Sequence, residues 1–71
     1  MSKVYFDKMG ESGNIFWVMG AAYTALLQEG RRQDAEAMQN KVMEQHSYEE
    51  ALEVIAEFVD LIEISGDKNS L

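Results

Sequence analysis

The chain has 71 residues, no cysteine, one histidine and a net charge of −7. That length allows a single domain, and a core this small is usually supplemented by disulfides, a metal or oligomerisation, so without cysteine we expect a homo-oligomer. The acidic balance excludes general nucleic-acid binding and attraction to anionic membranes, because both need a basic surface.

The first segment, Lys3 to Asp7, has the alternation expected of a half-buried strand. Val4 and Phe6 fall on one side of it, and the residues between them fall on the other. A lone strand at the N-terminus would have unpaired backbone groups, so we expect the other end of the domain to supply its partner.

A glycine-containing turn and an apolar helix come next. Asn14 is a good N-cap residue after the turn at 10–13, and Gly30 stands where a helix ends, so the pattern predicts a helix over residues 15–29. Its apolar run is too short to cross a bilayer, which takes about 20 residues. Apolar side chains cover so much of its circumference that it must be central to the core or to a subunit contact. Trp17 is the residue that we most expect at an interface.

Residues 31–46 have the pattern of a second, amphipathic helix. Its buried stripe comprises Ala35, Met38 and Val42. His46 falls at its end, where an imidazole complements the helix dipole and hydrogen-bonds the last carbonyl groups. We prefer this role to metal binding or catalysis, because the chain has no cysteine and no second histidine. The sequence therefore predicts no catalytic residue, no metal and no cofactor.

A capping box predicts the start of a third helix. Ser47 is followed three residues later by Glu50, so the helix begins at Tyr48. Its apolar positions are Tyr48, Ala51, Leu52, Ile55, Phe58 and Val59. Residues 61–64 fit either a continuation of this helix or a strand, and their β-branched residues favour a strand that pairs with the first.

The predicted fold is a mostly helical α/β domain of the order βαααβ. It covers residues 1–64 as one compact unit, and its terminal strands would pair in a two-stranded sheet. The polar segment at 65–71 would be a flexible C-terminal tail.

Several short motifs resemble a known group of proteins. The motifs are Gly13-Asn14-Ile15-Phe16, Met19-Gly20-Ala21, Ala25-Leu26-Leu27, Ser47-Tyr48-Glu49-Glu50-Ala51-Leu52 and Glu57-Phe58-Val59. They are similar to short proteins of phages, prophages and mobile elements that begin a helix with Gly-Asn-aromatic and carry a Ser/Asp-Tyr-x-x-Ala-Leu segment. The resemblance covers residues 13–64. It implies a βαααβ-like fold and a protein that modulates host defence or host machinery in the cytoplasm of the host cell.

Four acidic residues predict a ridge along the third helix. Glu49, Glu53, Glu57 and Asp60 are spaced by four, four and three residues, and no Lys or Arg occurs between positions 47 and 65. This pattern is more often simply the solvent-exposed face of a helix. As a functional surface, the ridge would imitate nucleic-acid phosphates and occupy a basic groove of a protein partner. Our leading hypothesis is a phage or mobile-element accessory protein that inhibits a host protein through this ridge or through an aromatic patch around Trp17.

Gly13, Asn14, Arg31 and Arg32 suggest an alternative, a site for a nucleotide-type ligand. The N–H groups at a helix start and an arginine pair would bind phosphate, particularly between subunits. An ordinary turn with an N-cap, and arginines paired with nearby carboxylates, explain the same residues. As a ligand site, they would make the chain an oligomeric sponge that sequesters a signalling nucleotide. A structural, self-assembling protein is the third alternative.

Overall fold

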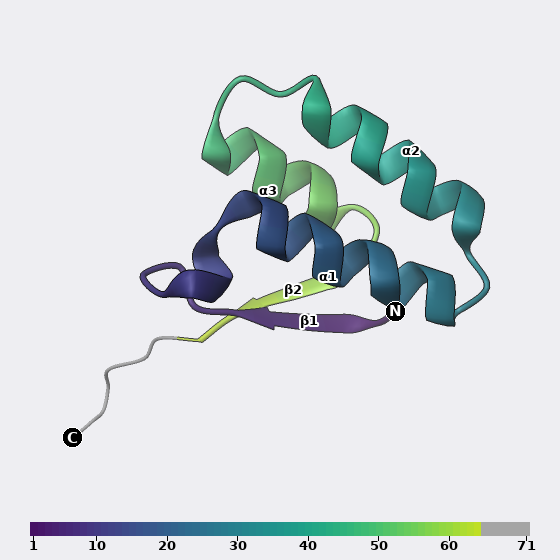
Figure 1. Cartoon of the computed structure of the whole chain (residues 1–71), viewed down its shortest axis with the longest axis horizontal. Coiled ribbons are helices and arrows are strands. Elements are labelled where there is room, and N and C mark those ends of the chain that lie inside the picture. Colours follow the sequence, from purple (N-terminus) through teal and green to yellow (C-terminus); the bar gives the residue numbers. More distant parts are fainter. Residues whose placement is uncertain (65–71) are drawn as a thin grey trace.

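The computed structural model has three α-helices and two strands in residues 1–64, in the predicted order (Figure 1). The elements are β1 (Lys3–Phe6), the short 3₁₀ helix η1 (Glu11–Gly13), α1 (Ile15–Gln28), α2 (Arg32–Met43), α3 (Tyr48–Ala56) and β2 (Asp60–Glu63). The predicted tail at 65–71 lies outside the described residues, which are 1–64. The mostly helical fold with a small sheet is therefore confirmed.

The two strands run parallel. Their register extends from Lys3 opposite Asp60 to Phe6 opposite Glu63, and the N–H of Ile64 donates to the carbonyl of Phe6 at 2.8 Å. Parallel strands need a long crossover connection, and here the three helices together provide it. α1 contacts β1, α3 contacts β2, and α2 packs across α1 and α3 (Figure 1).

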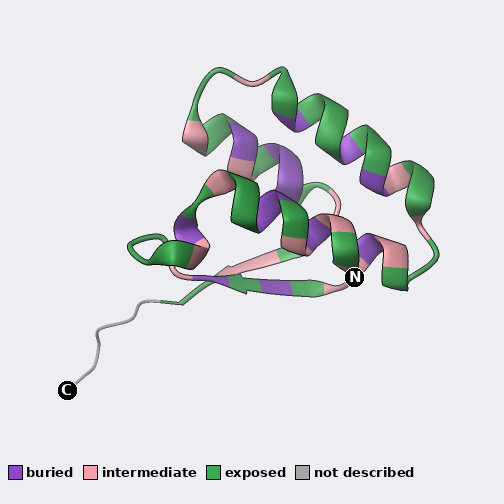
Figure 2. Ribbon diagram, viewed as in Figure 1, coloured by how far each residue is buried: buried purple, intermediate pink, exposed green. Residues whose placement is uncertain are grey.

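The core lies between the helices and one face of the sheet (Figure 2). Its buried residues are Val4, Phe6, Val18, Met19, Ala22, Leu26, Ala35, Met38, Val42, Ala51, Val54, Ile55 and Val59. No polar or charged residue is buried within residues 1–64. α1 contacts β1, η1, α2 and α3, which agrees with the expectation that this apolar helix is central.

Side-chain caps fix the starts of α1 and α3. Asn14 Oδ1 accepts a hydrogen bond from the N–H of Phe16 at 2.8 Å. Ser47 Oγ accepts from the N–H of Glu50 at 3.1 Å, and the Glu50 carboxylate accepts from the N–H of His46 at 3.2 Å. The carboxylate thus reaches one residue farther back than in the predicted capping box, where it would accept from the cap residue itself.

α1 ends at a glycine, as predicted. Gly30 has a φ of +76°, a conformation that favours glycine. The N–H of Arg31 donates to the carbonyl of Leu26 at 2.8 Å, and the N–H of Gly30 donates to that of Leu27 at 3.0 Å. This is the hydrogen-bond pattern of a Schellman motif, which satisfies the last carbonyl groups of the helix.

α2 ends at Met43, three residues before the predicted end at His46. The chain must leave the helix early because Ser47 is extended, with φ −144° and ψ 159°, in order to cap α3. The side chain of Gln45, rather than that of His46, satisfies the helix end by donating to the carbonyl of Lys41 at 2.9 Å. The predicted capping role of His46 is therefore wrong.

α3 is shorter than its apolar spacing predicts. It ends at Ala56, so Phe58 and Val59 lie in the turn before β2. Val59 is fully buried there, and Val54, which the predicted stripe omits, is buried on α3. Residues 60–63 form the predicted strand, one residue earlier than expected.

Gly13 is enclosed by backbone atoms in the connection between β1 and α1. A Cβ atom at this position would lie 2.3 Å from the carbonyl oxygen of Lys8 and 2.6 Å from that of Asp7. The hydroxyl of Tyr48 donates to the carbonyl of Gly13. This contact ties the start of α1 to the start of α3.

We expect Gly13→Ala to lower the free energy of unfolding by about 1–3 kcal/mol, because backbone atoms must move to admit the methyl group. Gly10→Ala is the matched control, since a Cβ there would meet only the side chain of Asp7, at 3.3 Å. Its effect should stay within about 0.5 kcal/mol. Urea unfolding of both variants measures the difference, and equal losses would contradict this explanation of Gly13.

Candidate functional site

α1 carries no charged residue along its 14 positions. Its outward side and the end of α2 form a surface that we call the aromatic face. The aromatic face consists of Phe16, Trp17, Gly20, Tyr23 and Thr24 of α1 and Met43 of α2. Phe16 is 63% exposed, Trp17 is 47% exposed and Met43 is 62% exposed. Contiguous exposed apolar surfaces of this kind often mark a site of contact with another molecule.

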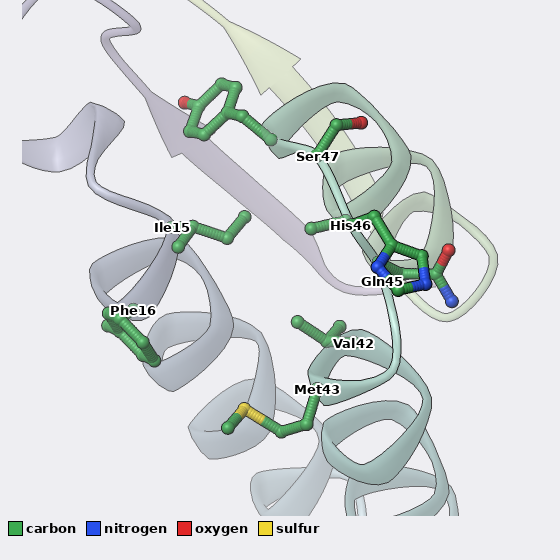
Figure 3. Close-up of a pocket in the computed structure, with 9 residues that line it drawn as sticks. Ile15, Phe16, Val42, Met43, Gln45, His46 and Ser47 are labelled. Carbon is green, nitrogen blue, oxygen red and sulfur yellow. The ribbon is translucent and has the colours of Figure 1, made fainter.

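A groove opens beside Phe16, between α1, α2 and the α2–α3 connection (Figure 3). It has a volume of about 350 Å³. Its lining residues are Ile15, Phe16, Val42, Met43, Gln45, His46, Ser47, Tyr48 and Ala51. Met43 extends from α2 toward Phe16 of α1 (Figure 3). His46 thus belongs to the wall of an apolar groove, not to the end of a helix.

Two further hollows continue the groove along α1. One, of about 530 Å³, is lined by Phe16, Trp17, Gly20, Ala21 and Thr24. The other, of about 300 Å³, is lined by Met19, Gly20, Tyr23, Thr24 and Gln39. No Asp, Glu, Lys or Arg lines the groove or these two hollows. The aromatic face is therefore both apolar and uncharged.

The sequence predicts that the apolar side chains of α1, which include Phe16, Trp17 and Tyr23, belong to the core or to a subunit contact. Within one chain Phe16 and Trp17 are exposed and Tyr23 is half-buried, so the core role is wrong for the first two. The role of Trp17 at an interface stays a prediction. Sequence reasoning misses Met43, because nothing in the α2 pattern shows that this residue ends beside Phe16.

The four residues of the predicted acidic ridge do not share one helix. Glu49 and Glu53 lie on α3, Glu57 is the first residue after it, and Asp60 belongs to β2. All four are exposed. Asp60 lies opposite Lys3 in the sheet. The first three still follow one helical face, because Glu57 keeps the helical backbone conformation at φ −71° and ψ −22°.

Lysines from other parts of the chain pair with the first and third carboxylates of this ridge. Lys8 Nζ lies 2.7 Å from the carboxylate of Glu49, and Lys41 Nζ lies 2.8 Å from that of Glu57. The hydrogen bond to Glu49 raises the pKa of Lys8. Glu53, between them, has no ion pair within residues 1–64. Both ion pairs are exposed and therefore weak, so they lower the ridge's charge more than they stabilise the fold.

Arg31 is engaged inside its own chain. Its Nε donates to Asp34 at 2.9 Å and its Nη1 donates to Glu29 at 3.1 Å. Nη1 also donates to the carbonyl of Phe58 at 3.4 Å. The hydrogen bond to Asp34, followed by that to Glu29, raises the pKa of Arg31. Arg31 thus links the start of α2 to the turn after α3.

One chain does not bring the predicted nucleotide-binding residues together. Gly13 and Asn14 precede α1, whereas Arg31 and Arg32 follow it, and its 14 residues rise about 21 Å. Asn14 already binds two N–H groups of the first turn, at 2.8 and 3.4 Å. Arg32 is exposed and lies 3.8 Å from Glu36. The turn and the cap therefore account for the first pair of residues.

No group of three or more His, Cys, Asp or Glu in residues 1–64 is placed to hold a metal ion. None of the helices in this part of the chain has both the length and the apolar character needed to cross a membrane.

Comparison with known proteins gives no relative. No family model, curated protein or solved structure matches the chain.

We expect Arg31→Ala to lower the midpoint of thermal unfolding by a few degrees, because it removes the link between α2 and the turn after α3. Arg32→Ala is the matched control, since its side chain has only a long contact with one carboxylate and should leave the midpoint unchanged. Scanning calorimetry on both variants measures this. A larger loss from Arg32→Ala would contradict the structural role of Arg31.

Proposed function

We propose that this chain is a non-catalytic phage or mobile-element accessory protein that binds and inhibits a host protein through the carboxylates of α3 and β2. The observation that carries the proposal is the charge of residues 48–63, which contain no Lys or Arg. Their carboxylates are Glu49, Glu50, Glu53, Glu57, Asp60 and Glu63. Only Glu49 and Glu57 of this set form ion pairs within residues 1–64.

Three of the five basic residues of the described chain lie beside these carboxylates, and the other two, Arg31 and Arg32, pair with carboxylates outside α3 and β2. Lys8, Arg31, Arg32 and Lys41 each form an ion pair, and Lys3 lies opposite Asp60 in the sheet. The carboxylates of α3 and β2 therefore outnumber the cations near them. Their field attracts a basic protein surface and speeds its association, and it repels nucleic acid.

The phage or mobile-element setting rests on the resemblance of the motifs at 13–16 and 47–52. In that setting a small protein without catalytic groups acts by covering a functional surface of its target. A groove that binds nucleic-acid phosphates is basic, so carboxylates carried on a rigid helix compete for it directly.

A nucleotide sponge has less support. Arg31 is already held by three partners, and Gly13 is backed by carbonyl oxygens that disfavour an anion. A purely structural self-assembling protein would leave the carboxylates of α3 and β2 without a role.

Capture experiments from a bacterial lysate test the proposal with the full chain immobilised. We expect the double variant Glu53→Lys, Asp60→Lys to weaken binding of the captured protein by at least about 10-fold, because opposed charges become like charges. Binding to the wild type should also fall as salt is raised.

The control is the double variant Glu11→Lys, Glu44→Lys, which changes the net charge equally but lies outside α3 and β2. It should retain most of the binding. An equal loss of binding in the two double variants would show an effect of net charge only. Binding that neither double variant weakens would overturn the proposal.

A further inference from the structure

We propose that the aromatic face is a homodimer interface, in which two copies of the chain pair about a twofold axis that passes close to Gly20 of α1. This contact uses different residues from the partner-binding carboxylates of α3 and β2. It extends the proposed function, and its test requires no partner.

The aromatic face has both parts that a self-complementary contact needs. Phe16 and Trp17 project into solvent, and the groove of about 350 Å³ opens next to them on the same face. A twofold axis places the same residues of both copies at one interface, so Phe16 and Trp17 of each copy pack against the aromatic face of the other. Trp17 then becomes buried in the dimer, which explains a large apolar side chain at this position.

Gly20 lies at the centre of this face. It lines both hollows that continue the groove along α1, with Phe16 one turn before it and Thr24 one turn after it. Apart from its two chain neighbours and the adjacent backbone of α1, no atom of residues 1–64 lies within 4 Å of the position that a Cβ would occupy at Gly20. The chain itself therefore leaves the position open, and a helix of a second copy can approach α1 closely there.

The charge distribution favours a second copy over a different protein. Every copy has a net charge of −7, so two copies repel each other through most of their surface. α1 has no charged residue, and no Asp, Glu, Lys or Arg lines its hollows. Two copies can therefore meet across this face with the least repulsion. A basic partner, in contrast, is attracted to the carboxylates of α3 and β2.

The aromatic face is large enough for a weak but specific contact between two copies. Phe16, Trp17 and Met43 are each about half exposed or more, and large side chains of this kind contribute roughly 300 Å² together. Contact over the adjoining hollows brings the buried area to about 500 Å² per copy, or roughly 1,000 Å² in total, which is the threshold for a biological interface and is typical of a weak dimer. A domain of 71 residues without cysteine gains stability from such burial.

Light scattering coupled to gel filtration tests the proposal on the full chain. We expect the wild type to be a dimer and Gly20→Lys to raise its dissociation constant at least about 100-fold, because each copy would bring an unpaired charge to the axis. The substitution lowers the net negative charge, so increased repulsion between copies would not explain a loss of the dimer. Ala37→Lys is the matched control, because it adds the same charge at an exposed position of α2 outside the aromatic face and should leave the dimer intact.

A cross-linking experiment keeps the test valid if the separated chains unfold. The chain has no cysteine, so Gly20→Cys and Ala37→Cys each introduce a single thiol. A short bis-maleimide should join two copies of Gly20→Cys efficiently and leave Ala37→Cys mostly unjoined. A wild-type monomer at every concentration, a trimer, or equal cross-linking of the two variants would each overturn the proposal.

Discussion

Parallel pairing of β1 with β2 is the constraint on which the rest of the structure depends. Because both strands run in the same direction, the chain must return along the sheet, and the three helices make that crossover. α1 and α3 each contact one strand of the sheet, and α2 closes over both helices. α1 is thereby covered by the sheet, α2 and α3, and its remaining side is the aromatic face.

The crossover also separates two kinds of surface. α1 contributes apolar side chains without charge, whereas α3 and β2 contribute carboxylates without a basic residue of their own. The hydrogen bond from Tyr48 to the carbonyl of Gly13 joins the starts of α1 and α3, and Tyr48 also lines the groove. This hydrogen bond therefore adds to the core packing that holds the helix of the proposed dimer interface against the helix of the proposed partner-binding surface.

Signals that act within a few residues can be read from the sequence. The caps at Asn14 and Ser47 and the stop at Gly30 are predicted correctly, because each involves only neighbouring backbone groups. Among contacts across the chain, the pairing of the two terminal strands is predicted, because a lone β1 would have unpaired backbone groups, but side-chain contacts are not predicted. Arg31 reaches the carbonyl of Phe58 over 27 residues, and no periodicity encodes that distance. The exposure of the aromatic face likewise depends on which side of α1 is covered by α2.

The central claim is that self-association and partner binding use surfaces of opposite character. Sedimentation equilibrium of the wild-type chain across a series of salt concentrations tests it most directly. We expect the dimer to hold or strengthen as salt rises, because the contact is apolar and salt screens the repulsion between acidic copies. A dimer that dissociates as salt rises would show that ion pairs hold it together, and this would contradict the assignment of the aromatic face.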